Sequence, residues 1–160
     1  MSKKTLYIAR HAKSDWSDAS LSDFERTLNP RGKKDAPFMA KLLKEKGIKP
    51  ELILSSPATR AKETAKEYHS VLGGELRFNA HIYEASTLSL RYLVEETFQE
   101  VDTLMLVGHN PGLTGLNDLL SDKSIYNLVT AAVVAIEFDE EVGSHKGRQV
   151  FFEYPKKTTQ

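Results

Sequence analysis

The segment Thr5-Leu6-Tyr7-Ile8-Ala9-Arg10-His11 changes abruptly from apolar to polar, and this change decides the fold. Its first five residues form a short β-prone run, which predicts a buried strand with Arg10 and His11 at its carboxyl end. The pattern recurs at Glu51–Ser55, before Ser56-Pro57, and at Thr103–Val107, before Gly108-His109-Asn110-Pro111-Gly112. A buried strand followed by polar residues is therefore predicted three times.

Helical patterns separate these predicted strands. Apolar residues follow helical spacing between Pro30 and Gly47, and a second helix is expected from about Ala58 to Leu72. Strands alternating with helices predict an α/β sandwich. We further expect a short edge strand over Leu76–Tyr83 and helices over Thr87–Gln99 and Gly112–Leu120. The last two runs, Ala131–Phe138 and Gln149–Tyr154, predict an antiparallel hairpin, which makes the sheet mixed.

Length and composition narrow the class of protein. A chain of 160 residues predicts one domain over residues 1–160. With no cysteine, thiolate nucleophiles, disulfides and cysteine-ligated metals are excluded. The 22 basic and 22 acidic residues balance, so charge favours neither a nucleic-acid partner nor a membrane surface. No apolar run approaches the roughly 18 residues of a membrane span, so a soluble cytoplasmic protein is expected.

The predicted strand ends place four functional side chains together. In open α/β sheets the ligand crevice lies beyond the carboxyl ends of the strands, where Arg10, His11, Arg60 and His109 are expected. Two histidines alone suggest a metal, but guanidinium groups do not normally stand beside a divalent cation. Arginine matches phosphate oxygens instead. The set therefore predicts a pocket for a phosphoryl group and no metal.

An imidazole in such a pocket can be the nucleophile that takes the phosphoryl group and later yields it to water. We expect His11 in this role because it lies at a buried strand end next to Arg10. His109 would stabilise charge on the transferring oxygens. Helix N-termini near Ala58 and Gly112 would add backbone donors, and this chemistry requires no cofactor.

Three ordered blocks resemble the histidine phosphatase superfamily, also called phosphoglycerate-mutase-like. Leu6-Tyr7-Ile8-Ala9-Arg10-His11-Ala12 resembles its R-H-G signature, with Ala12 in place of a glycine that would allow other φ angles. Ser55–Ala65 is similar to its S-x-x-x-R-A-x-x-T-A block, and Val107–Gly112 to its G-H block. The small size and the segment Arg26-Thr27-Leu28-Asn29-Pro30-Arg31-Gly32 resemble the SixA-type phosphohistidine phosphatases.

This resemblance implies a fold, a site and the absence of a cofactor. The implied fold is a three-layer α/β/α sandwich with a mixed, mostly parallel central sheet. His11 would be the nucleophile, and the phosphate ligands would be Arg10, Arg60 and His109, joined by Arg26. Neither a metal nor another cofactor belongs to this implied site.

Two residues carry alternative interpretations. Glu84 is a candidate proton donor to the leaving group, and it is equally well explained as a helix-capping or solvated carboxylate. Arg60 could instead form a helix-surface salt bridge with Glu63 or Glu67.

These residues predict a phosphatase that acts on phosphohistidine or another phosphorylated side chain of a protein. The linkers between the three blocks leave little room for a lid, and an open site suits a macromolecular substrate. A small phosphate ester is the alternative substrate. A non-catalytic phosphate-binding module is the alternative from another functional class.

Overall fold

The computed structural model describes residues 3–155, and its centre is a six-stranded sheet in the order β3-β2-β4-β1-β5-β6. The strands are β1 (Lys4–Arg10), β2 (Leu52–Ser55), β3 (Glu75–Phe78), β4 (Thr103–Gly108), β5 (Val133–Phe138) and β6 (Arg148–Glu153).

The sheet is mixed and mostly parallel, as predicted. Strands β3, β2, β4 and β1 are parallel to one another, β5 is antiparallel to β1, and β6 pairs with β5 as an antiparallel hairpin. The register aligns Arg10 of β1 with Gly108 of β4, and Ser55 of β2 with Val107 of β4. The three strand ends singled out by the sequence therefore lie at one edge of the sheet.

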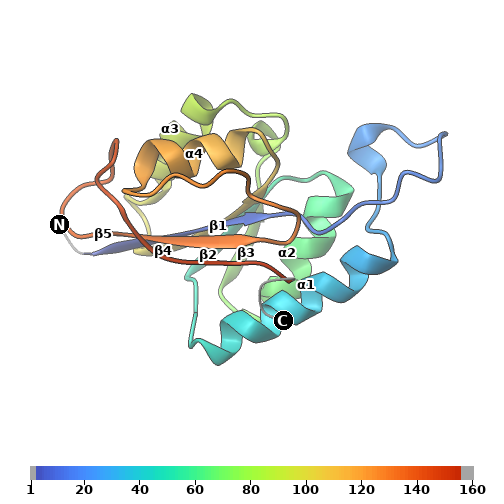
Figure 1. The fold of residues 1–160 in the computed structure, drawn as a ribbon, viewed down its shortest axis with the longest axis horizontal. Helices are drawn as coiled ribbons and strands as arrows, with labels where there is room; N and C mark the ends of the chain where they lie inside the picture. The colour runs from blue at the N-terminus through green and yellow to red at the C-terminus, as the bar shows by residue number, and fades with distance from the viewer. Residues whose placement is uncertain (1–2, 156–160) are drawn as a thin grey trace.

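Helices cover both faces of this sheet, which confirms the three-layer sandwich (Figure 1). Helices α1 (Pro30–Glu45) and α2 (Thr59–Leu72) lie on one face, and α3 (Thr87–Thr97) and α4 (Gly112–Leu120) lie on the other. Within residues 3–155, no helix is long and apolar enough to span a membrane.

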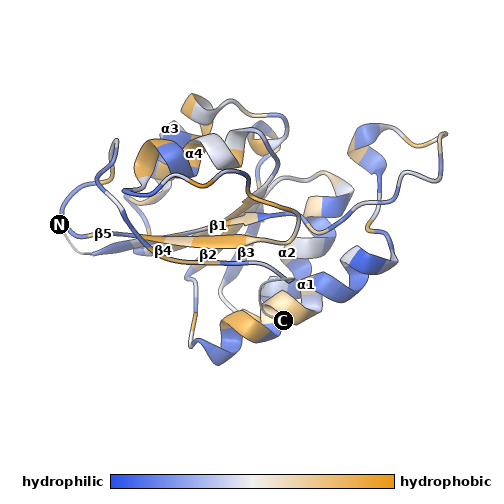
Figure 2. Cartoon of the chain, viewed as in Figure 1, coloured by the Kyte–Doolittle hydropathy of each residue, from blue (hydrophilic) through white to orange (hydrophobic). Residues whose placement is uncertain are grey.

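The core consists of two apolar clusters, one on each side of the sheet. In β4, Leu104 and Leu106 point toward the cluster that includes α3 and α4, whereas Met105 and Val107 point toward the cluster of α1 and α2. All four are fully buried, because successive side chains of a strand point to opposite faces and both faces are covered. Figure 2 shows apolar colouring in the central strands and in parts of the helices that cover them.

One predicted element differs from the structure. The edge strand expected over Leu76–Tyr83 ends at Phe78, and Ala80–Ile82 forms a short 3-10 helix, η2. The side chain of Asn79 accepts a hydrogen bond from the backbone N–H of His81 at 2.8 Å. This local bond favours a turn over continued strand pairing and directs the chain toward the site.

Candidate active site

Four predicted site residues come together at the shared edge of the sheet. Arg10 ends β1 and His11 follows it, Arg60 lies in the first turn of α2, and His109 follows β4. The ring centroids of His11 and His109 are 5.2 Å apart, and Nε of Arg60 lies 3.4 Å from Nε2 of His11. The structure therefore gathers the two imidazoles and a guanidinium around one point.

The ring of His11 is held in a defined tautomer. Its Nδ1 lies 2.7 Å from the backbone carbonyl of Ala12, and a carbonyl oxygen can only accept a hydrogen bond. The proton must therefore be on Nδ1, which leaves a lone pair on Nε2. Burial is the main reason that the pKa of His11 is lowered to about 3, so the ring is neutral at physiological pH. Nε2 of His11 therefore carries the unprotonated electron pair that a nucleophile requires.

Ala12 replaces the signature glycine without requiring an unusual backbone conformation. Among the non-glycine residues of the described chain, positive φ angles occur at Glu84, Ala131 and His145, and not at Ala12. The Ala12 side chain is fully buried in the α1 and α2 cluster, and its N–H donates to Oγ1 of Thr64 at 3.0 Å. The loop after the nucleophile candidate is thus accommodated with alanine.

His109 is held by a serine from the second sequence block. Its Nε2 lies 2.8 Å from Oγ of Ser56, and that hydroxyl accepts a hydrogen bond from the N–H of Ala58 at 3.2 Å. Burial and then the charge of Arg60 lower the pKa of His109 to about 4. Its Nδ1 is buried and has no hydrogen-bond partner within residues 3–155.

The arginines make the site electropositive. Nη1 of Arg10 donates to the carbonyl of Leu128 at 3.1 Å, whereas its Nε is buried without a partner in the part of the chain that the structure describes. Burial and then the charge of Arg60 lower the pKa of Arg10. Two guanidinium groups that repel each other are stabilised by a bound anion, so the arrangement favours anion binding.

Two helix N-termini reinforce this preference. Helix α2 begins at Thr59 and α4 at Gly112, and neither N-cap residue, Ala58 or Pro111, makes a side-chain capping hydrogen bond. The first N–H groups of a helix lack intrahelical partners and carry the positive end of the helix dipole. Both termini follow strands that end at the site, as the sequence predicted. At α4 the N–H of Leu113 donates to the His109 carbonyl and that of Thr114 to Oδ1 of Asn110, so the N-terminus of α2 is the better source of donors to an anion.

Arg26 reaches the site through Asp23, a residue that the sequence analysis did not identify. The buried guanidinium of Arg26 donates to Oγ of Ser14 at 3.0 Å and stacks on Trp16 at 3.3 Å from the ring centroid. Its Nε and Nη2 donate to Oδ1 of Asp23 at 3.2 and 2.8 Å. Arg60 donates through Nη1 to the Asp23 carbonyl at 2.6 Å and through Nη2 to Oδ2 at 3.1 Å.

These contacts correct the alternative proposed for Arg60. Its ion pair is with Asp23, 37 residues away, and not with Glu63 or Glu67 on its own helix. Glu63 instead accepts a hydrogen bond from the backbone N–H of Leu28 at 3.0 Å. The reason is the direction of Arg60: in the first turn of α2 it points beyond the end of the sheet, toward the segment that follows β1.

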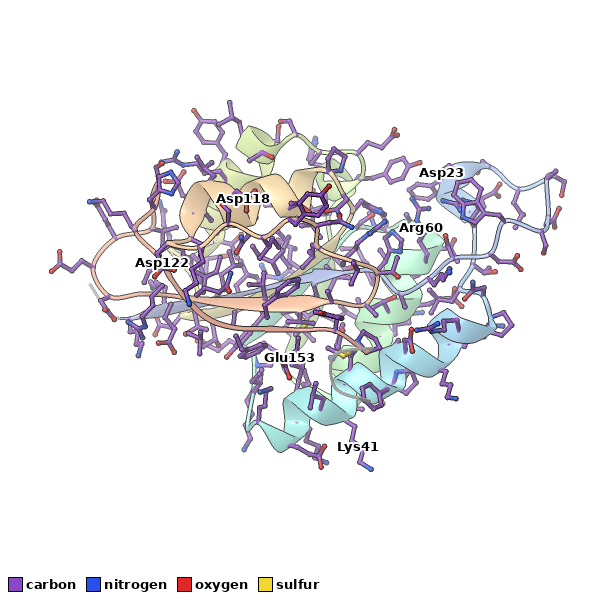
Figure 3. All side chains as sticks on the ribbon, viewed as in Figure 1. Asp23, Lys41, Arg60, Asp118, Asp122 and Glu153 are labelled. Atoms are coloured by element: carbon purple, nitrogen blue, oxygen red, sulfur yellow. The ribbon has the colours of Figure 1, made fainter. Side chains whose placement is uncertain are left out.

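The segment between β1 and α1 forms one side of the site. Residues 13–29 form an arm that includes the 3-10 helix η1 (Asp23–Glu25), and Figure 3 shows Asp23 on this arm beside Arg60. The Phe24 ring packs edge-on against Tyr83 at 5.0 Å, and Tyr83 packs edge-on against His109 at 5.4 Å. A capping box between Ser22 and Glu25 forms η1, so a short linker still builds a wall.

Glu84 lies at the rim of this wall. It is exposed and has a φ of 55°, and Ser86, not Glu84, provides the N-cap of α3. The capping interpretation is therefore wrong. Glu84 directly follows Tyr83, and its charge contributes to raising the Tyr83 pKa. The carboxylate is thus near the site, where it can act as a proton donor or remain a solvated group.

Sequence signals for the missed residues were weak but present. Asp23 precedes Arg26 by three residues, a spacing that puts both on one side of a 3-10 turn. Ser56 lies within the quoted block Ser55–Ala65, and Tyr83 directly precedes Glu84. As to metals, residues 3–155 contain no group of three or more histidine, aspartate or glutamate side chains arranged to hold an ion.

The lowered histidine pKa values predict a specific pH dependence. An unfolded chain has imidazole pKa values near 6.5, whereas the folded values are about 3 for His11 and about 4 for His109. Below pH ~6.5 the unfolded state therefore binds more protons, and the free energy of unfolding should fall as the pH drops toward these folded values. Denaturant unfolding across this range measures the loss.

The ¹⁵N chemical shifts of the two imidazole rings, measured as a function of pH, test the lowered pKa values directly. Both rings should titrate far below the reference value of about 6.5, and inorganic phosphate should raise both midpoints because an anion favours the imidazolium form. A midpoint near the reference value for His11 in the free protein would contradict the burial argument.

Comparison with known proteins identifies a family and a relative in plants. Residues 6–106 match the family described as the histidine phosphatase superfamily (branch 1). An uncharacterized chloroplastic protein of Arabidopsis thaliana is 34% identical over 76% of this chain, and the match spans 61% of the plant protein, which is less than two thirds of its length.

Solved structures share the fold. The SixA protein of Agrobacterium tumefaciens, for which phosphohistidine phosphatase activity is inferred, matches with a TM-score of 0.82 and 26% identity, covering 95% of this chain and 98% of that one. A protein histidine phosphatase SixA complexed with tungstate matches with a TM-score of 0.83 and 21% identity, covering 97% and 99% of the two chains.

Proposed function

The chain belongs to the histidine phosphatase superfamily, and from this premise we propose that it removes phosphoryl groups from phosphohistidine on a protein substrate through a covalent intermediate on His11. One observation carries the proposal. The hydrogen bond from Nδ1 to the Ala12 carbonyl leaves a lone pair on Nε2 of His11, 3.4 Å from the Nε donor of Arg60. A nucleophile thus stands beside a phosphate-binding group.

The first proposed step is transfer of the phosphoryl group to His11. Nε2 forms a bond to phosphorus while the bond from phosphorus to the leaving nitrogen or oxygen breaks, and the leaving group takes a proton. Arg10, Arg60 and His109 bind the phosphoryl oxygens as charge spreads over them, and Arg26 adds charge beside Arg60. The Ala12 carbonyl stabilises the Nδ1 proton as the ring becomes positively charged.

The second step is hydrolysis of the intermediate. Water attacks phosphorus from the side opposite Nε2, the bond between nitrogen and phosphorus breaks, and inorganic phosphate leaves with the oxygen of the water. His11 recovers its neutral form as the electron pair of the broken bond returns to Nε2, and the proton released by the attacking water passes to solvent. The chemistry uses side chains of this chain alone.

Phosphohistidine is the proposed substrate for two reasons. Its imidazole leaving group can be protonated from solvent before the bond between phosphorus and nitrogen breaks, so a weakly placed general acid is sufficient. The similarity to the Agrobacterium SixA protein points the same way. The alternative is a small phosphate ester, whose alkoxide leaving group requires a proton donor, and Glu84 at the rim is the candidate for that role.

A substrate panel tests this proposal. The full-length protein is incubated with a phosphohistidine protein, a phosphotyrosine peptide, a phosphoserine peptide and small phosphate esters, each with and without EDTA. We expect the highest kcat/KM for phosphohistidine and no effect of EDTA. A preference for small esters would favour the alternative substrate, and binding of phosphate without turnover of any substrate would identify a phosphate-binding module.

Glu84→Gln separates the two roles of this carboxylate. If Glu84 donates a proton, the substitution should slow hydrolysis of an alkyl phosphate by about 10²- to 10⁴-fold, because an alkoxide is a poor leaving group. Phosphohistidine should lose less than about tenfold, since solvent protonates its imidazole. The ratio of kcat/KM values for the two substrates measures the difference.

The matched control is Glu25→Gln, which changes an exposed carboxylate of the arm bonded to Ser22. Equal losses on both substrates would show that Glu84 shapes the loop. Rates equal to those of Glu25→Gln on both substrates would show a solvated carboxylate.

A further inference from the structure

Asp23 connects two arginines and a tyrosine from different parts of the chain. Its Oδ1 accepts from Nε and Nη2 of Arg26, and its Oδ2 accepts from Nη2 of Arg60 and from the hydroxyl of Tyr83 at 2.6 Å. Its backbone carbonyl accepts a further bond from Nη1 of Arg60. One residue therefore joins the arm, the start of α2 and the segment after η2.

We propose that Asp23 is a positioning residue that fixes Arg60 and Arg26 in the geometry required to bind the transferring phosphoryl group. This inference rests on the proposed function of the site. Asp23 acts through the two arginines, and the side-chain hydrogen bonds of its carboxylate are to Arg26, Arg60 and Tyr83.

The direction of the Arg60 donors supports positioning. Two of its nitrogens, Nη1 and Nη2, are held by Asp23, while Nε points to Nε2 of His11. Asp23 thus fixes the guanidinium plane so that Nε faces the nucleophile, and one N–H on each of Nη1 and Nη2 is left for an anion. An arginine side chain has several freely rotating bonds, and ordering it before substrate binds removes an entropic cost from the reaction.

The position of the Asp23 carboxylate argues against a second interpretation, in which this carboxylate occupies the phosphoryl site and competes with phosphate. The Asp23 side chain is 48% exposed, whereas those of Arg60 and Arg26 are 7% and 8% exposed. The carboxylate therefore lies on the solvent side of both arginines. The buried, unpartnered Nε of Arg10 and Nδ1 of His109 belong to the residues clustered around His11 and remain available to an anion.

Charge gives a second reason for an acidic residue here. Three guanidinium groups, those of Arg10, Arg26 and Arg60, lie near two imidazoles that are neutral. The hydrogen bond from Tyr83, followed by Arg26 and Arg60, lowers the pKa of Asp23 to about 2, so its carboxylate is ionised. It reduces the net charge of the three guanidinium groups from +3 to +2, which balances the charge of −2 on a phosphoryl dianion.

Tyr83 extends this arrangement. Its hydroxyl donates to Oδ2 of Asp23, and its ring contacts both Phe24 of the arm and His109. The bond holds the carboxylate toward Arg60. Removal of the hydroxyl should therefore affect catalysis only while Asp23 is present.

The test compares Asp23→Asn, Tyr83→Phe, the double variant and the control Glu25→Gln in the full-length protein. Asparagine keeps the shape of aspartate but loses the charge and half of the acceptor capacity. Measurements are kcat and KM on a phosphohistidine protein, the inhibition constant of inorganic phosphate, its calorimetric Kd, and the thermal unfolding midpoint. Glu25→Gln keeps a side chain able to cap η1.

Asp23→Asn should lower kcat/KM by about 10- to 100-fold, chiefly in kcat, and weaken phosphate binding, because a misplaced guanidinium binds the transition state poorly. Tyr83→Phe should cost about two- to tenfold. In the double variant, loss of the Tyr83 hydroxyl should lower kcat/KM no further than Asp23→Asn alone, since the hydroxyl acts through Asp23. These results, with unfolding midpoints close to that of Glu25→Gln, support the positioning role.

Two other outcomes overturn the positioning role of Asp23, and a third overturns the part assigned to Tyr83. Tighter phosphate binding in Asp23→Asn would identify a competing carboxylate. Kinetics equal to those of Glu25→Gln would show that Asp23 is unimportant to the arginines. Additive losses in the double variant would mean that Tyr83 acts independently. An inactive wild type with weakened phosphate binding in Asp23→Asn would instead reject the phosphatase and retain the positioning role.

Discussion

His11→Ala should reduce phosphatase turnover by about 10³-fold or more, because loss of a nucleophile removes the covalent route and leaves only binding effects. The native fold should persist, since the His11 ring makes hydrogen bonds only to the adjacent Ala12 carbonyl and to Arg60 within the described chain. Single-turnover rates on a phosphohistidine protein measure the first effect, and thermal unfolding measures the second.

The matched control for this variant is His81→Ala, which removes an exposed histidine of η2. It should retain the wild-type rate. More than about a tenth of wild-type activity in a folded His11→Ala protein would remove His11 from the covalent step. Retained phosphate binding in that variant would show that the pocket itself is intact.

Arg60→Ala should lower kcat by about 10²- to 10³-fold and weaken the binding of inorganic phosphate, since a buried guanidinium stabilises charge that develops on the phosphoryl oxygens. Arg60→Lys should restore little, because the single ammonium nitrogen of lysine cannot take the place of three separate guanidinium nitrogens that donate to His11, the Asp23 carbonyl and the Asp23 carboxylate. Steady-state kinetics and phosphate calorimetry measure both effects.

Arg77→Ala is the control for loss of an arginine. Arg77 is exposed on β3, where its ion pairs are with Glu75 and Glu100, and its removal should leave kcat unchanged. If Arg60→Ala changes KM alone, Arg60 serves substrate docking and has no role in the transition state.

Much of this fold was predictable because its parallel strands are buried on both faces. A run such as that of β4 is continuously apolar, so it marks a central strand, and the polar residues that follow it mark the functional edge of the sheet. Arg10, His11, Arg60 and His109 could be placed together for that reason. Their convergence follows from topology and needs no knowledge of side-chain contacts.

The arm and its contacts were not predictable in this way. Asp23 and Arg60 are 37 residues apart, and Tyr83 and Asp23 are 60 residues apart, so no local periodicity records either bond. The expectation of an open site rested on the short linkers between the blocks, and the arm lacks the regular spacing that would have predicted its fold. Its shape depends on a three-residue helix and on the stacking of Arg26 on Trp16.

The role of Glu84 could not be predicted from the sequence either. Whether a carboxylate caps a helix depends on where the helix begins, and helix boundaries are the least certain part of a pattern. Here Ser86 accepts from the N–H of Ser89 and provides the cap of α3, which leaves Glu84 exposed at the rim.

The central claim is that the phosphoryl group passes through His11, and trapping the intermediate tests it most directly. Wild-type protein is mixed with ³²P-labelled phosphohistidine substrate, quenched in alkali within the first turnover, digested and mapped. We predict an acid-labile, base-stable phosphate on His11 that forms and decays at rates consistent with kcat. Label on Ser14 or Ser56, or turnover with no labelled protein at any time, would contradict the claim.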